Sequence, residues 1–126
     1  MPQQMDNQSL GKLGEQLACE ALTRRGYAII ATRHRTRFGE IDIVSEHNGV
    51  VVFVEVKARQ ASAEHDDAAE AVSPLKRRRV AAMALDYLAW TGQLDSPCRF
   101  DVVAIDGIGS PLETVRIVDH AWEMDY

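Results

Sequence analysis

The chain has 126 residues, of which 46% are hydrophobic and 26% charged, and its formal net charge is −5 at pH 7. A chain of this length forms one domain around one core, and the acidic balance excludes a protein that coats nucleic acid through bulk positive charge. The charges are unevenly spread, since 12 of the 14 basic residues precede Val80. A local basic surface and an ordinary mixed surface are both compatible with these counts.

The N-terminal segment lacks the apolar stretch that a secretory signal contains. Residues 1–8 are polar and predicted to be disordered, which leaves 9–126 as a single domain. No apolar run approaches the length of a transmembrane helix. We therefore expect a cytoplasmic protein that does not enter a membrane.

A first helix is predicted over Leu10–Arg25, with Ser9 as its cap. Gly11 and Gly14 each cost about 1 kcal/mol relative to Ala in a helix interior, so they indicate that another element packs closely there. Glu15 lies on the flank beside them. It is either an ordinary surface glutamate or an accessory acid of a polar site.

The first strand is predicted over Tyr27–Thr32 and leads into a basic loop. The loop carries Arg33, His34, Arg35, Arg37 and Phe38. We favour contact of these cations with phosphate groups over a purely solvated surface, because a polyanion is neutralised by such side chains.

A hairpin is predicted where two β-branched runs, Gly39–Val44 and Val51–Lys57, flank Asn48-Gly49. An Asn-Gly pair between such runs is the strongest short-range signal for a tight antiparallel turn. With these two residues at the centre of the turn, Asp42 lies opposite Glu55.

The same register places Glu40 opposite Lys57. Because side chains alternate across a strand, the hairpin has one polar and one apolar face. The polar face is predicted to hold Glu40, Asp42, Glu55 and Lys57, and the apolar face Ile41, Ile43, Val54 and Val56.

The two opposed carboxylates have Cβ atoms about 5 Å apart, at which distance they repel by roughly 3 kcal/mol at an effective dielectric near 20. A shared proton, a nearby cation or a bound divalent metal would offset this repulsion. Lys57 supplies one positive charge. Six of the seven residues in Val50–Val56 are apolar, which is typical of a strand buried on both faces. A magnesium site, which also suits manganese, accounts best for an acid in this setting.

Residues 60–71 are acidic and poor in large apolar side chains, which predicts a mobile loop beside the site. His65 with Asp66 and Asp67 is an alternative second metal cluster, although no rigid scaffold is implied for it.

Ser73-Pro74 predicts the start of a second helix that runs to about Trp90. Its inward face is expected to hold Leu75, Ala82, Leu85 and Ala89. Basic side chains crowd its first two turns, where cations oppose the helix dipole by about 0.3 to 1 kcal/mol each. They either bind phosphate or are simply solvated. The residues expected to bind nucleic acid are thus Arg35, Arg37, Lys76, Arg77, Arg78 and Arg79.

A further buried strand is predicted over Phe100–Asp106 and an edge strand over Glu113–Val118. A strand, a helix and another strand in succession predict a parallel neighbour for the second hairpin strand. The predicted fold is α/β, with a mixed five-stranded sheet flanked by helices.

Four segments in this order resemble a known family. They are Gly11-x-x-Gly14-Glu15, the pair Gly39-Glu40-Ile41-Asp42 and Phe53-Val54-Glu55-Val56-Lys57, Ala71-Val72 with Lys76, and Arg99-Phe100-Asp101. The second resembles the PD-(D/E)xK signature of the restriction-endonuclease-like nucleases. The whole set, from Gly11 to Asp101, resembles the bacterial YraN family, which is similar to Holliday-junction resolvases.

This resemblance implies a restriction-endonuclease-like core and Mg²⁺-dependent hydrolysis of phosphodiester bonds, with branched or structured DNA as substrate and a homodimer as the acting form. It implies that Asp42 and Glu55 are metal ligands. Lys57 would be the catalytic lysine and Glu15 an accessory catalytic acid. The alternatives are a non-catalytic module that retains the fold and binds DNA or a protein, and a metal-dependent hydrolase of a small phosphate ester.

Overall fold

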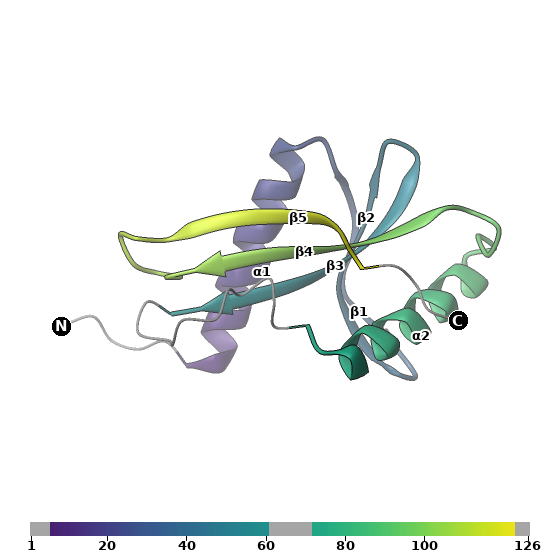
Figure 1. Ribbon diagram of the computed structural model, residues 1–126, viewed down its shortest axis with the longest axis horizontal. Coiled ribbons are helices and arrows are strands. Elements are labelled where there is room, and N and C mark those ends of the chain that lie inside the picture. The colour runs from purple at the N-terminus through teal and green to yellow at the C-terminus, as the bar shows by residue number, and fades with distance from the viewer. Residues whose placement is uncertain (1–5, 61–71, 123–126) are drawn as a thin grey trace.

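The computed structural model describes residues 6–60 and 72–122. Its elements in chain order are α1 (Asn7–Arg24), β1 (Ala28–Thr36), β2 (Gly39–His47), β3 (Val50–Arg59), α2 (Pro74–Trp90), β4 (Cys98–Asp106) and β5 (Thr114–Trp122). Figure 1 shows them as one strongly twisted sheet with two helices. No helix within the described ranges is long and apolar enough to cross a bilayer.

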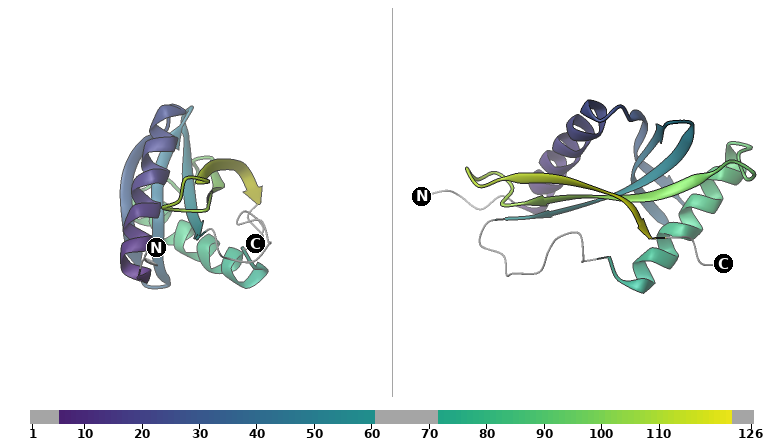
Figure 2. Two further views of the ribbon diagram at one scale, coloured as in Figure 1. Left: turned by 90° about the vertical axis from the view of Figure 1, so that its left-hand side faces the viewer. Right: turned by 45° about the horizontal axis from the view of Figure 1, so that its top comes forward.

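The five strands form one mixed sheet in the order β1-β2-β3-β4-β5. Strands β3 and β4 are parallel, and the other neighbours are antiparallel. The two helices lie on opposite sides of the sheet (Figure 2). The predicted α/β class, the five-stranded mixed sheet and the parallel neighbour of the second hairpin strand are confirmed.

The hairpin of β2 and β3 has the predicted register. Its backbone pairs run from the residues beside the turn to Ile43 opposite Val54. Asn48 has φ 53° and Gly49 has φ 78°, the left-handed conformation that a type I′ turn requires at both central positions. The local Asn-Gly signal therefore sets the alignment of the whole hairpin.

The pairing of β2 with β3 stops one residue short of the acids. Among the described backbone pairs, neither Asp42 with Glu55 nor Glu40 with Lys57 is included. The carboxylate of Asp42 accepts the backbone N–H of Val56 at 2.8 Å. A side chain thus replaces the backbone acceptor, because the two strands diverge here.

The divergence also changes which face each side chain occupies. Ile41 packs in the cluster beneath α2, whereas Ile43 packs in the cluster beneath α1. The predicted common face for these two residues is therefore wrong, because strict alternation does not hold where the strands part.

Two apolar clusters hold the helices on the sheet. The α1 cluster is made by Ala18, Leu22, Tyr27, Ile43, Val52, Val54, Val103, Ile105 and Ile108. The α2 cluster is made by Ile41, Val44, Val51, Phe53, Val80, Ala81, Met83, Ala84, Tyr87, Leu88 and Phe100. Each helix thus covers its own side of the sheet.

The predicted inward face of the second helix is wrong. Leu75 and Leu85 are 61% and 36% exposed. Tyr87 packs edge-on against Phe53 of β3, with ring centroids 5.7 Å apart. The helix is rotated so that Tyr87, rather than the predicted leucines, packs against the sheet at Phe53.

Helix α1 begins at Asn7, three residues earlier than predicted, because Asp6 and not Ser9 caps it. The Asp6 carboxylate accepts the backbone N–H of Ser9 at 2.7 Å. Of the segment predicted to be disordered, residues 1–5 lie outside the described residues and 7–8 are helical.

The two helix glycines differ in role. A Cβ at Gly14 would lie 3.4 Å from Cβ of Ala58 and 3.6 Å from Cγ1 of Val56, whereas a Cβ at Gly11 would meet nothing within 4 Å. The predicted close packing is therefore confirmed at Gly14 and wrong at Gly11. Gly14 brings α1 close to the half of β3 that follows Glu55.

Two predicted loops stand differently. The basic loop is largely strand, because β1 continues through Arg33 to Thr36. The predicted loop over 60–71, with His65, lies outside the described residues apart from its first position. Strand β5 extends four residues beyond the predicted edge strand, to Trp122.

Candidate functional site

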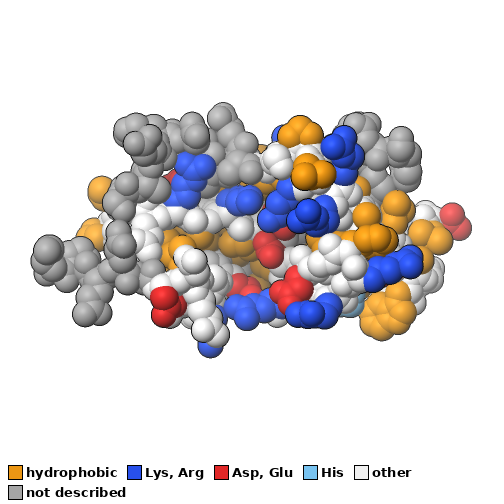
Figure 3. All heavy atoms as spheres, turned by 90° about the horizontal axis from the view of Figure 1, so that it is seen from below, with side chains coloured by type: hydrophobic (Ala, Val, Ile, Leu, Met, Phe, Trp, Pro, Cys, Tyr) orange, Lys and Arg blue, Asp and Glu red, His pale blue; other side chains and the backbone are white. Residues whose placement is uncertain are grey.

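A groove of about 280 Å³ lies between α1 and the strands β1, β2 and β3, where β2 and β3 diverge. We call it the acidic groove. It is lined by Asn7, Leu10, Gly11, Gly14, Glu15, Arg33, Glu40, Asp42, Val56 and Ala58. Figure 3 shows a face of the molecule on which acidic side chains lie among lysine and arginine side chains. The predicted acids Glu15 and Asp42 thus meet in one concave site.

Asp42 is partly buried, at the point where the sheet opens. Burial raises its pKa, and this outweighs the Val56 N–H and the ammonium groups of Lys76 and Lys57, which lower it. The nearby carboxylate of Glu15 raises it further. The surrounding hydrogen bond and lysines therefore do not fully offset the cost of burying the negative charge of Asp42.

Glu55 lies deeper, with 3% of the residue exposed. Burial and then the charge of Asp42 raise the pKa of Glu55, while Lys76 lowers it. Its Oε2 lies 3.1 Å from Nζ of Lys76. No hydrogen bond of good geometry from the described residues reaches this oxygen, so it retains capacity for a further partner.

Two lysines stand beside the two acids. Burial, followed by the charge of Lys76, lowers the pKa of Lys57. Lys76 comes from the first turn of α2, and its ammonium group supplies the nearby cation that the hairpin requires. Asp42, Glu55, Lys57 and Lys76, which we call the charged quartet, therefore carry no net formal charge when all four are ionised.

Glu15 forms an exposed ion pair at the rim of the acidic groove. Nε of Arg33 lies 2.6 Å from its Oε2. Arg33 was predicted to lie in a basic loop that contacts phosphate, and its ion pair with Glu15 was not predicted. Its φ of 49° marks an irregular position in β1, which no sequence signal of its own identifies.

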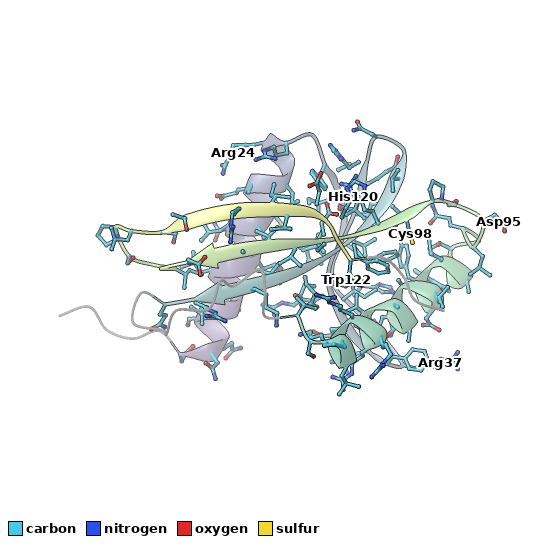
Figure 4. All side chains as sticks on the ribbon, viewed as in Figure 1. Arg24, Arg37, Asp95, Cys98, His120 and Trp122 are labelled. Carbon is cyan, nitrogen blue, oxygen red and sulfur yellow. The ribbon has the colours of Figure 1, made fainter. Side chains whose placement is uncertain are left out.

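The predicted nucleic-acid-binding residues have different partners within the chain. Arg35 pairs with Glu40 and Arg37 with Asp86, while Lys76 belongs to the charged quartet. Arg77 donates to the carbonyl of Val72 at 3.1 Å and lies over the ring of Trp122, whose position near the start of α2 is seen in Figure 4. Arg78 and Arg79 are exposed.

The donors suit a hard divalent cation only in part. Asp42 and Glu55 offer carboxylate oxygens, the ligands that Mg²⁺ and Mn²⁺ prefer, and the buried Oε2 of Glu55 lacks a well-formed hydrogen bond. No group of three or more His, Cys, Asp or Glu side chains able to hold a metal occurs among residues 6–60 and 72–122. An ion here would rely on two carboxylates and on water or substrate oxygens.

A second polar cluster lies inside the sheet, beneath α1. The carboxylate of Asp101 accepts from Tyr27 Oη at 2.7 Å, from Arg99 Nε and Nη2 at 2.9 Å each, and from the backbone N–H of His120 at 3.1 Å. The ring of Tyr27 stacks on His47 at 4.1 Å. Both oxygens of this carboxylate accept two hydrogen bonds each, so we assign the cluster a structural role.

Tyr27→Phe tests that assignment through pH. Burial and the hydrogen bond to Asp101 raise the pKa of Tyr27 from 10.0 to about 12. The native state therefore holds its phenolic proton more tightly, and the wild type should lose stability as pH rises from 10 to about 12. The variant should lack this loss and be less stable by about 1 kcal/mol near neutral pH.

The measurement is urea unfolding at several pH values. Tyr87→Phe is the matched control, since its hydroxyl is not part of this cluster. Equal pH profiles for wild type and Tyr27→Phe would contradict the assignment.

The sequence matches known proteins over most of its length. Residues 14–105 match the model of the family described as "Uncharacterised protein family UPF0102". A UPF0102 protein of Symbiobacterium thermophilum is 48% identical over 97 residues, which cover 77% of this chain and 81% of the relative. One of Syntrophus aciditrophicus is 46% identical over 121 residues, covering 95% and 93%. One of Geotalea uraniireducens is 40% identical over 121 residues, covering 96% and 94%.

Proposed function

Since the chain belongs to the UPF0102 family, as the resemblance to YraN proteins predicts, we propose its function from the site itself, because the family name assigns no chemistry. We propose that the protein is a metal-dependent nuclease. In this proposal the sheet and helices are a restriction-endonuclease-like core, and the substrate is a phosphodiester bond of DNA. Acting as a homodimer on branched DNA is a finer prediction of the same resemblance.

The observation that supports the proposal most strongly is the burial of Glu55 beside Asp42. Two carboxylates with raised pKa values, next to a lysine with a lowered pKa, cost the fold stability. Such perturbed groups concentrate at functional sites. Of the three, Asp42 lines the acidic groove, and Glu55 and Lys57 interact with Asp42 without being among the residues that line it.

The residues divide into distinct roles. Asp42 and Glu55 would hold Mg²⁺ or Mn²⁺, which when bound offsets negative charge and makes water a better nucleophile. Lys57 would stabilise the charge that develops on the phosphoryl oxygens. Lys76 holds Glu55 in position through its ion pair. Glu15 lies nearer the surface and would orient water from the rim.

The ion pair of Lys76 with Glu55 favours a second candidate function. Because a cation already offsets the buried acid, the quartet is also compatible with a non-catalytic module that binds DNA or a protein. We rank it second, because a module of this kind has no need for a second buried carboxylate in the opening of its sheet.

We expect Mn²⁺ to raise the melting temperature. An ion that binds only the native state adds about 2.7 kcal/mol to the free energy of unfolding at a hundredfold excess over its Kd. Melting curves with Mn²⁺, Mg²⁺ or EDTA measure the shift, and Glu40→Gln is the control for an exposed acid of the same groove. Unchanged melting together with no heat of binding by calorimetry would refute the metal site.

Cleavage assays with the same two metals test the activity itself. Labelled branched, duplex and single-stranded DNA serve as substrates, and a phosphate diester of low molecular weight tests the small-ester alternative. Binding of DNA without cleavage of any substrate would favour the non-catalytic module.

A further inference from the structure

A second groove, of about 380 Å³, lies between β1 and the last turns of α2. We call it the aromatic groove. It is lined by His34, Arg35, Thr36, Arg37, Asp86, Tyr87 and Trp90. Figure 4 shows Arg37 beside α2, at the turn between β1 and β2.

The rings of this groove form a stack that reaches from solvent to the core. Trp90 is 74% exposed and stacks on His34, with ring centroids 5.6 Å apart and ring planes 29° apart. His34 meets Tyr87 edge-on at 5.2 Å, and Tyr87 meets the buried Phe53 at 5.7 Å. The exposed indole is thus supported from below.

The aromatic groove lies on the α2 side of the sheet and the acidic groove on the α1 side, and both are lined by residues of β1. Arg33 lines the acidic groove and its neighbour His34 lines the aromatic one. Likewise Glu40 lines the first and Arg35 the second, and the two are joined by an ion pair of 3.1 Å. Because β1 is the edge strand of the sheet, a chain molecule that contacts both grooves would have to pass around this edge.

We propose that the aromatic groove binds an unpaired nucleobase, which stacks on Trp90 and His34 while Arg35 and Arg37 contact the flanking phosphates. The inference rests on the proposed function, because it takes the ligand of the acidic groove to be a polynucleotide. It adds that the bound strand has at least one base outside a double helix. A base paired within a duplex has no free face to offer the indole.

The surface chemistry favours a nucleotide over an apolar protein segment. The side chains of Arg35 and Arg37 are 82% and 77% exposed. Their partners Glu40 and Asp86 hold them in exposed ion pairs, which contribute little to stability and exchange readily for a phosphate. Aromatic faces beside exposed cations are the usual features of sites for single-stranded nucleic acid.

Tryptophan fluorescence gives a direct test. The chain has two tryptophans, so Trp122→Phe leaves Trp90 as the sole indole. In EDTA, where no cleavage occurs, oligodeoxythymidylate should quench this fluorescence. An abasic oligonucleotide of equal length, which has the same phosphates and no bases, should quench it much less.

Affinities complete the test. Trp90→Ala should weaken binding of oligodeoxythymidylate about tenfold, leave binding of the abasic strand unchanged, and so remove the preference for bases. Trp90→Phe should restore part of it. Leu112→Ala removes a side chain that is 79% exposed between β4 and β5, and should change neither affinity.

The outcomes separate this inference from the proposed nuclease. Unaltered base preference in Trp90→Ala, no quenching, or no binding of either oligonucleotide would overturn the aromatic site, whereas metal-dependent cleavage would still uphold the acidic one. Quenching without metal binding would support the aromatic site and count against the nuclease. A change of oligomeric state on Trp90→Ala, with fluorescence insensitive to oligonucleotides, would assign the groove to self-association and overturn the inference.

Discussion

Glu55→Gln should abolish both Mn²⁺ binding and cleavage. The amide keeps the size of the side chain and removes its charge, and a lost ligand should reduce metal affinity by more than the roughly 10- to 100-fold that supporting residues of a metal site contribute. Calorimetry with Mn²⁺ and cleavage assays on the same preparation measure both effects.

The stability of metal-free Glu55→Gln supplies an independent readout. Burial raises the pKa of Glu55 above its ordinary value of 4.5, so the native state binds more protons than the unfolded state just above that pH. Wild-type stability should therefore fall as pH rises from about 4.5 through the native pKa. The fall should be smaller in Glu55→Gln. Cleavage that persists undiminished in this folded variant would place the active site elsewhere.

Lys57→Ala should lower turnover by roughly 10² or more while leaving Mn²⁺ affinity and DNA affinity nearly unchanged. A preorganised group that stabilises developing charge acts on the transition state, so its loss appears in kcat rather than in binding. Steady-state cleavage with separate kcat and KM, beside calorimetry with metal, measures the division.

Two lysine variants sharpen this comparison. Lys12→Ala removes an exposed lysine from α1 and should have no effect on turnover. Lys76→Ala leaves the buried Glu55 without its ion pair. It should therefore lower the free energy of unfolding more than it lowers turnover. If Lys57→Ala loses stability to the same extent as Lys76→Ala and keeps its turnover, Lys57 has only a structural role.

Local signals in the sequence predicted the elements that carry the acids. The Asn48-Gly49 turn set the hairpin register, and Ser73-Pro74 set the start of α2, where the Ser73 hydroxyl accepts the N–H of Lys76 at 3.2 Å. Both are interactions between residues close in sequence, whose geometry depends little on the rest of the fold.

The features that the sequence analysis did not predict depend on contacts between residues far apart in the chain. The rotation of α2 about its axis depends on how Tyr87 meets Phe53, and the ion pair of Lys76 with Glu55 depends on where α2 begins relative to β3. In the same way, Trp90 and His34 meet only because α2 packs across β1. Neither pairing has a period or motif in the sequence.

Because Asp42 accepts a hydrogen bond from the backbone N–H of Val56, Asp42 and Glu55 should differ in which substitutions they tolerate. Glu55 contributes a charge that pairs with Lys76 at the start of α2, so a neutral residue of the same shape loses this ion pair but no backbone hydrogen bond of the kind that Asp42 makes. Asp42 also takes over an acceptor that the separating backbone no longer supplies. If the proposed catalysis is right, a relative without it is free to vary at Glu55 but should retain an acceptor such as asparagine at the position of Asp42, so that inactivity would leave its trace at only one of the two positions.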